Sequence, residues 1–220
     1  MINNIMETST RAIRLNFPKY LKSEFTAMSD AIFQHIKKIT PPTQRIGNFV
    51  VHSYEDRNEV FKVYWENGNI KAEEVKNLTW DDLENNIPGL RNFIEKYSLE
   101  KSWTMANGHA VPPHRHYYSL DSMWSISMFQ GQSSGTIQFY HNQNKVGAGE
   151  FKQFSPTFDG WVCAEEIKSY AGDFYSLRTW SWHGWLAHEE QHENYCTIFY
   201  MKDTPTYEKA IAAIRKIEEV

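Results

Sequence analysis

PPHRHYYSLDSMWSISMF, residues 112–129, carries two histidines, His114 and His116, directly ahead of a run rich in apolar and aromatic residues. In a β-strand, residues two apart point to the same face of the sheet. The spacing therefore predicts that both imidazoles face one interior, where neutral histidine is a ligand for iron, zinc, copper or nickel. An isolated pair of this kind is a weak signal, and a metal site needs a third ligand from elsewhere in the chain.

Short segments with strand character lie on both sides of this stretch, and each is bounded by Gly, Pro, Asn or Ser. They are SWTMANG (102–108), GTIQFYH (135–141), GWVCAEE (160–166), DFYSLRTW (173–180) and YCTIFYM (195–201). Regular short strands separated by turn residues are typical of a sandwich or barrel of the jelly-roll type. We therefore expect a mainly β fold, a cupin-like jelly-roll barrel with flanking helices.

A third metal ligand is available at the far end of a later predicted strand. The segment GDFYSLRTWSWHG, residues 172–184, ends in His183 beside a glycine, and His188 follows shortly after. Because a jelly roll brings strands that are distant in sequence side by side, a histidine at this place can complete a site with His114 and His116. His183 is the first choice for the third ligand, and His188 is the alternate.

Four segments, PPHRHYYSLDSMWSISMF, SSGTIQFY, GDFYSLRTWSWHG and YCTIFYM, together resemble the double-stranded β-helix oxygenases. They are most similar to the iron- and 2-oxoglutarate-dependent members, which show the same order of a histidine-bearing strand, a distal histidine and a closing strand. The resemblance covers roughly residues 100–202. It implies a dioxygenase, acting as a hydroxylase, in which His114, His116 and His183 bind Fe(II) and 2-oxoglutarate is the cosubstrate.

The sequence departs from this family at the second metal ligand. The oxygenases typically use His-x-Asp/Glu and a distal histidine, whereas His116 occupies the carboxylate position here. The phrase Gly108-x5-His114-x-His116 also fits the first cupin motif, and Asp121 falls near the acidic residue of that motif. The resemblance therefore implies either a site of three histidines or a site that uses Asp121 instead.

A second departure concerns the cation that binds the far carboxylate of 2-oxoglutarate. The family usually has Arg or Lys about ten residues after the distal histidine, whereas residues 189–201 contain neither. Arg178 is the first candidate to replace it, because it lies on the predicted strand that leads to His183, and Arg115 and Lys152 are the others. If none of them serves, 2-oxoglutarate is not the cosubstrate.

Aromatic residues surround the predicted site. Tyr140 and Tyr118 are candidates to point into the barrel and hydrogen-bond a cofactor. The long segment 142–157 is a candidate lid over the barrel mouth. The predicted wall of the substrate pocket, which would keep water from the metal, consists of Trp180, Trp182 and Trp185.

The remaining segments are expected to pack around the barrel as parts of one structural domain. Residues 1–100 are predicted to form helices and a hairpin, with a helix over 16–38 and a turn at Asn67-Gly68. Residues 101–203 form the jelly-roll core, and 204–220 form a C-terminal helix.

Composition narrows the functional class. Of the 220 residues, 41% are hydrophobic, which favours a sizeable core, and the net charge of −4 does not indicate nucleic-acid binding. Two cysteines exclude a disulfide framework and a four-cysteine zinc site. No segment has the features of a membrane span or a signal peptide, so we expect a cytoplasmic protein. Its expected partner is a small molecule or a side-chain substrate, and a dimer is compatible with the sequence.

Two alternatives to the 2-oxoglutarate-dependent oxygenase remain open at this point. The first keeps the barrel and the metal but not 2-oxoglutarate, as in a cupin-like dioxygenase or isomerase whose substrate binds the metal directly. The second is a jelly-roll binding module without enzymatic activity, in which the histidines line a polar groove. Metal content separates the second alternative from the two enzymes, and turnover of the cosubstrate separates the enzymes from each other.

Overall fold

The structure, a computed structural model, describes residues 5–7, 11–39, 48–54, 57–66, 69–107, 110–116, 123–131, 134–142, 160–188 and 194–220. Within these residues the helices are α1 (Lys19–Ile39), α2 (Trp80–Asn86), α3 (Leu90–Lys96) and α4 (Tyr207–Glu218). The strands are β1 (Ile5–Glu7), β2 (Ala12–Leu15), β3 (Asn48–Tyr54), β4 (Arg57–Glu66), β5 (Asn69–Thr79), β6 (Leu99–Asn107), β7 (Ala110–His114), β8 (Trp124–Gly131), β9 (Gly135–Asn142), β10 (Trp161–Ser169), β11 (Phe174–Arg178), β12 (His183–Ala187) and β13 (Asn194–Met201).

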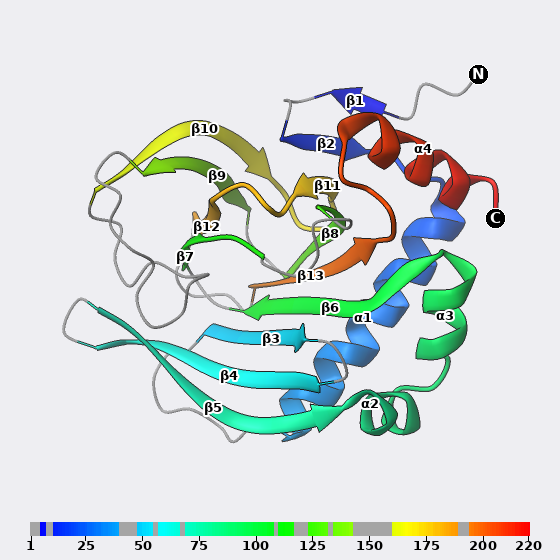
Figure 1. The fold of residues 1–220 in the computed structure, drawn as a ribbon, viewed down its shortest axis with the longest axis horizontal. Helices are drawn as coiled ribbons and strands as arrows, with labels where there is room; N and C mark the ends of the chain where they lie inside the picture. Colours follow the sequence, from blue (N-terminus) through cyan, green and yellow to red (C-terminus); the bar gives the residue numbers. More distant parts are fainter. Residues whose placement is uncertain are drawn as a thin grey trace.

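The strands form two antiparallel sheets that pack as a barrel (Figure 1). The larger sheet has the order β1-β2-β11-β8-β13-β6-β3-β4-β5, and the smaller has the order β10-β9-β12-β7. Eight of the strands pair in a nested way: β9 with β10, β8 with β11, β7 with β12 and β6 with β13. One long hairpin folded over on itself produces this nesting, which is the jelly-roll topology. The fold class predicted from the sequence is confirmed.

Segments from the N-terminal part of the chain widen the larger sheet at both edges. β1 and β2 add to β11, although the sequence analysis assigned no element to residues 5–15. At the other edge β3 pairs with β6, and β4 and β5 form the predicted hairpin. Its pairs run from Arg57↔Thr79 to Glu66↔Asn69, with a register shift between Val60 and Phe61. The turn residues Asn67 and Gly68 lie outside the described residues.

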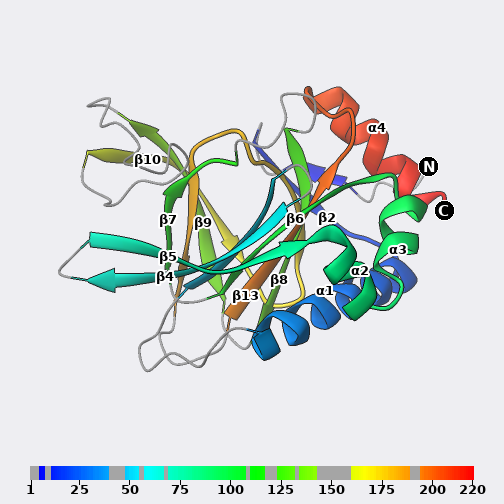
Figure 2. The same cartoon turned by 60° about the horizontal axis from the view of Figure 1, so that its bottom comes forward.

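The four helices cover one face of the larger sheet, and the smaller sheet lies on its other face; the turned view in Figure 2 shows the same arrangement. α1 follows Pro18 and buries the apolar stripe that contains Leu21, Phe25 and Ile32. The Thr206 hydroxyl accepts a hydrogen bond from the backbone N–H of Lys209 and caps α4. No helix in the described ranges has the length and apolar character that a membrane crossing requires.

Alternation along the strands gives the larger sheet two buried faces. On β8, Trp124, Ile126 and Met128 belong to the hydrophobic cluster under the helices. Phe129 belongs to a second cluster between the two sheets. Since strand residues two apart share a face, the buried Ser127 and Ser125 also point into the space between the sheets. This space is the barrel interior, and its polar end holds the candidate site.

Candidate metal centre

Two of the predicted ligands come from neighbouring strands of the smaller sheet. His114 is the last residue of β7 and His183 is the first residue of β12, and they are cross-strand partners. Their ring centroids are 4.4 Å apart, and only 6% of His114 and 4% of His183 is exposed. The jelly-roll register therefore brings together two histidines that are distant in the sequence.

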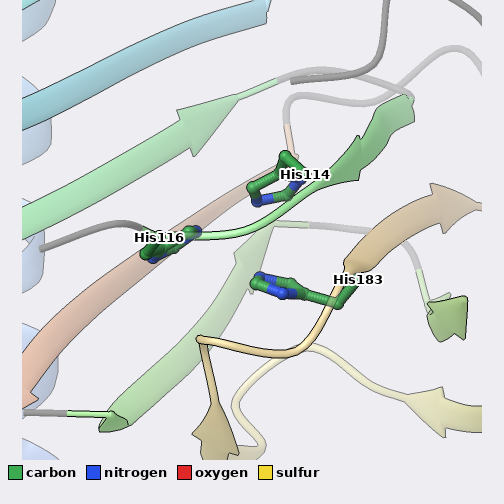
Figure 3. Close-up of side chains that lie close together, drawn as sticks. All are labelled: His114, His116 and His183. Atoms are coloured by element: carbon green, nitrogen blue, oxygen red, sulfur yellow. The ribbon is translucent and has the colours of Figure 1, made fainter. Parts of the chain in front are cut away.

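The third histidine lies just beyond the end of β7. The backbone N–H of His116 donates to the carbonyl oxygen of Thr179 at 2.9 Å, which holds this segment beside the turn that leads to His183. The His116 ring centroid lies 5.0 Å from that of His114 and 4.9 Å from that of His183. One ligand nitrogen from each of the three residues lies within 4.8 Å of the other two, which suits a single ion (Figure 3).

The hydrogen bonding of His183 prepares one ring nitrogen for a metal. Its Nδ1 lies 2.7 Å from the carbonyl oxygen of Ser181, and because a carbonyl only accepts, Nδ1 carries the proton. Burial lowers the pKa of His183 to about 4, against a smaller opposing effect of the Ser181 hydrogen bond. The ring is therefore neutral at pH 7 with its lone pair on Nε2. This atom is buried and has no hydrogen-bond partner in the described part of the chain, so its lone pair could bind a metal.

His116 is oriented by a residue of the opposite sheet. The hydroxyl of Tyr200 on β13 lies 2.5 Å from His116 Nδ1, and both residues are buried. A metal-binding histidine is usually held in this way through its second ring nitrogen, which sets both the tautomer and the plane of the ring. The hydrogen bond therefore assigns Nε2 of His116 to the metal.

The donor set consists of three imidazoles. The cluster contains no carboxylate from the described part of the chain. Neutral imidazole ligands fit iron and also zinc, copper or nickel, and three protein ligands leave coordination positions open for other molecules. The arrangement fits a mononuclear metal centre.

Two rows of residues line the barrel at the level of this cluster. In the smaller sheet, Phe139 on β9 is the cross-strand neighbour of His183, and their ring centroids are 6.1 Å apart. In the larger sheet, Ser125 pairs with Leu177 on β11 and with Tyr200 on β13. The wall beside the triad therefore combines aromatic and aliphatic surface with hydroxyl groups.

Arg11 places a cation at the edge of this interior. It precedes β2 in the larger sheet, and its Cζ lies 5.9 Å from the ring centroid of Phe139 in the smaller sheet. Its Nη1 is 4.0 Å from Glu165 Oε2 on β10, and a quarter of each side chain is exposed. The side chain therefore spans from one sheet to the other close to the ring that packs on His183.

A second cation lies against aromatic rings next to the ligands. The guanidinium carbon of Arg115 is 5.3 Å from the ring centroid of Trp180 and 5.2 Å from that of Trp182. Trp182 in turn packs against Trp161 with ring centroids 4.5 Å apart. Trp180 and Trp182 are thus neighbours of the ligand segments, and both are half-buried. Their assignment to the wall of a substrate pocket stays a prediction.

The structure does not bring the other candidates to the cluster. His188 is exposed, and its ring nitrogens lie 3.0 Å from Ser134 Oγ and 2.7 Å from Thr136 Oγ1, so it is not the third ligand. Trp185 packs in the apolar cluster between the sheets and donates from Nε1 to Ser169, so its assignment to a substrate pocket has to be corrected.

Strand alternation corrects two further assignments. Leu177 belongs to the cluster between the sheets, and its neighbour Arg178 shares the opposite face of β11 with Phe174, which packs under the helices. Phe139 points into the barrel, and Tyr140 therefore points out of it, where its hydroxyl donates to Gln138. Neither Arg178 nor Tyr140 is placed to bind a cofactor inside the barrel. The remaining candidates Asp121, Tyr118 and Lys152, and residues 143–157 of the predicted lid, lie outside the described residues.

The sequence analysis missed Tyr200 and Arg11. The alternation in YCTIFYM, with Cys196, Ile198 and Tyr200 on one face, was a usable signal for Tyr200. Arg11 had no such signal, because the short β2 becomes a strand only by pairing with β11.

No model of a known protein family matches this chain, and no curated protein sequence matches it significantly. Among solved structures, it is similar to an oxidoreductase of the 2OG-Fe(II) oxygenase family from Burkholderia pseudomallei, at 12% identity and a TM-score of 0.39, over 89% of this chain and 88% of that one. It is also similar to YcfD from Escherichia coli (11% identity, TM-score 0.38, 95% and 57% covered) and to oxalate oxidase in complex with glycolate (12% identity, TM-score 0.29, 47% and 43% covered). The matched part spans less than two thirds of these last two chains.

The fold assignment depends on the strand pairing of this chain itself. That pairing, with two histidines at facing ends of β7 and β12, is the double-stranded β-helix arrangement to which the sequence resemblance pointed. The chain therefore has a jelly-roll (double-stranded β-helix) fold with a cluster of three buried histidines at one end of its barrel.

Proposed function

We propose that this protein is a mononuclear non-haem iron oxygenase in which His114, His116 and His183 bind Fe(II). The observation that carries the proposal is the convergence of three buried histidines, with the lone pair of His183 Nε2 left for a metal by the Ser181 hydrogen bond. Iron at this place would supply the activation of molecular oxygen. The surrounding Phe139 and Tyr200 side chains, both buried, would exclude water.

We further propose 2-oxoglutarate as the cosubstrate, with Arg11 as the partner of its far carboxylate. An anionic group in this interior would need a cation or several donors, because a buried unpaired charge is strongly destabilising. Arg11 is supported by its position over Phe139, and its contact with Glu165 at 4.0 Å is long enough to be exchanged for a ligand carboxylate. The Ser125 hydroxyl, at the same level of the barrel as the histidine cluster, offers a further hydrogen-bond donor. The primary substrate in this proposal is a small molecule or a side chain, and the compartment is the cytoplasm.

A second candidate function is a cupin-like dioxygenase whose substrate binds the metal directly. It is favoured by the contact of Arg11 with Glu165 and by the lack of Arg or Lys in residues 189–201, where the 2-oxoglutarate-dependent oxygenases usually carry the cation for their cosubstrate. A substrate that binds the metal directly does not need that cation. In this case Arg11 keeps its pairing with Glu165 and takes no part in binding.

The first experiment measures metal. Protein purified without chelator is expected to contain about one transition-metal ion per chain, and metal-free protein should bind Fe(II) without air at micromolar concentration or below. Failure to bind any transition metal at micromolar levels contradicts both enzyme proposals and leaves a binding module.

The second experiment separates the two enzymes. The iron-loaded protein is incubated with oxygen and 2-oxoglutarate, and succinate is measured together with oxygen consumption. Arg11→Met is expected to raise the KM for 2-oxoglutarate at least tenfold with unchanged metal binding. Arg14→Met is the matched control, because Arg14 lies on β2 but pairs with Asp173 at 2.9 Å, away from the triad. No succinate, or equal KM values for the two variants, favours the second candidate.

A further inference from the structure

The two segments that carry the histidines dock against each other at one place. Residues 115–116 follow β7, which ends at His114, and residues 179–182 form the turn between β11 and β12, which begins at His183. The backbone hydrogen bond from His116 to Thr179 joins the two segments. The geometry of the triad therefore depends on how firmly these segments are held together.

Arg115 adds a side-chain connection between them. It lies between His114 and His116 in the sequence, and its guanidinium carbon is 5.3 Å from the ring centroid of Trp180 and 5.2 Å from that of Trp182, both in the turn. A guanidinium group is planar and charged, so it is attracted to the faces of two indole rings at once. The histidines on either side of Arg115 do not take part in this contact: the rings of His114 and His116 stack on each other, with centroids 5.0 Å apart.

The turn is itself anchored to the rest of the smaller sheet through Trp182. Its ring packs on Trp161 of β10, and Trp161 makes an edge contact with Tyr140 of β9 at a centroid distance of 6.2 Å. The backbone N–H of Tyr140 donates to the carbonyl oxygen of Trp182 at 2.9 Å. Arg115 is thus the end of a stack that extends across the sheet.

We infer that Arg115 is a positioning residue for the metal centre: its stack between Trp180 and Trp182 fixes His114 and His116 relative to His183. The inference rests on the proposed metal site, of which Arg115 is not itself a proposed ligand. Metal affinity depends on ligands that are already in place before binding, and residues that orient them typically change it by about 10–100-fold when mutated.

The test is a Co(II) titration of metal-free protein, read by the visible absorption of the bound cobalt. Arg115→Met keeps an apolar chain of similar length but removes the charged, planar guanidinium group. We expect at least about tenfold weaker cobalt binding and a changed absorption spectrum of the bound cobalt. Arg115→Lys keeps the charge without the planar stack and should recover part of the affinity. Lys37→Met is the matched control, since Lys37 Nζ lies 5.7 Å from the Phe33 ring centroid on α1, and it should bind cobalt as the wild type does.

The coupling to the turn is tested with Trp182→Leu and with Trp180→Leu, which also serve if Arg115→Met does not fold. If Arg115 acts through the stack, combining Arg115→Met with Trp182→Leu weakens cobalt binding by less than the product of the two single effects. Unchanged cobalt affinity and spectrum in Arg115→Met, beside a wild type that binds cobalt, overturn the inference and leave the proposed function intact. A wild type that binds no cobalt overturns both.

Discussion

The two ends of the barrel interior share strand β12 but differ in whether their buried polar atoms have hydrogen-bond partners. At the apolar end, Trp185 donates to Ser169 at 3.1 Å and Tyr175 donates to the carbonyl oxygen of Lys168 at 2.9 Å, so their polar atoms are satisfied. At the other end, His183, two residues before Trp185 on β12, buries a nitrogen with no partner among the described residues.

This difference indicates separate roles for two residues of β12, Trp185 in stability and His183 in metal binding. Leaving a buried polar atom without a partner costs about 1–3 kcal/mol, so a native protein retains such an atom where it has a use. Satisfied aromatic residues such as Trp185 contribute packing and are expected to matter for folding. His183 carries the nitrogen without a partner, and we expect it to matter for metal binding.

The largest effect is expected from the removal of His183 at the polar end of the barrel. His183→Ala should weaken metal binding more than about 100-fold and abolish turnover, because two remaining ligands hold the ion weakly and leave its geometry undefined. The thermal midpoint of the metal-free protein should change little. A metal titration and a thermal unfolding curve measure the two properties. His188→Ala is the control, and a His183→Ala chain that loses its fold would indicate a structural role instead.

The second prediction concerns pH and the metal-free protein. His183 has a pKa of about 4 in the folded chain and about 6.5 when unfolded, so between these values the unfolded chain binds a proton that the folded chain does not. The contribution of His183 to stability is complete above pH 6.5 and is lost as the pH falls to 4, by about 3 kcal/mol in total. Denaturant unfolding at several pH values measures it. The loss should be absent in His183→Asn and present in His188→Asn; equal profiles in both would contradict the neutral, buried assignment.

The third prediction concerns a substitution that disturbs packing at the apolar end of the barrel without changing the proposed metal site. A Cβ added at Gly135 would lie 2.4 Å from the Trp185 ring, closer than atoms can approach. Gly135→Ala should therefore destabilise the fold by about 1–3 kcal/mol, and Trp185→Leu in the same chain should recover part of the loss. Metal affinity should stay at its wild-type value. A metal affinity that falls with the stability would show that the two ends are not independent.

The smallest effect is expected from the removal of one hydrogen bond at the polar end of the barrel. Tyr200→Phe keeps the ring and removes the hydrogen bond to His116 Nδ1, so metal binding should weaken about tenfold. Tyr195→Phe on the same strand removes a hydrogen bond to Asp30 and should leave metal binding unchanged. Isothermal titration of the metal-free proteins compares the two. Equal affinities would mean that Tyr200 does not orient the ligand.

Much of the fold was readable because its elements are local. The helical spacing of Leu21, Phe25 and Ile32 predicted α1, and short aromatic strands between turn residues predicted the jelly roll. β1 and β2 were not readable, because short strands at a sheet edge exist only through their pairing with β11. Local patterns predict long periodic elements and fail for such strands.

Within the site, two of the errors have one common cause. Arg178 and Tyr140 were assigned to the barrel interior because they lie on the right strands, but each is one position away from the residue that points inward, Leu177 or Phe139. In FYSLR both faces carry apolar residues, since the larger sheet is buried on both sides, so alternation alone does not tell which face meets the histidine cluster. For Tyr140 the alternation of Ile137 and Phe139 with polar residues was informative.

The sequence by itself determined the kind of barrel and the chemistry of its ligands, because strand periodicity, turn residues and the His-x-His spacing are local properties of the chain. The tertiary structure alone decided which distant histidine joins the pair, which side chains orient the rings and which cation reaches the interior. His183 rather than His188, Tyr200 and Arg11 were all selected by the register between strands that are far apart in the sequence. A register shift of one residue turns every side chain to the opposite face, and only the packed sheets determine it.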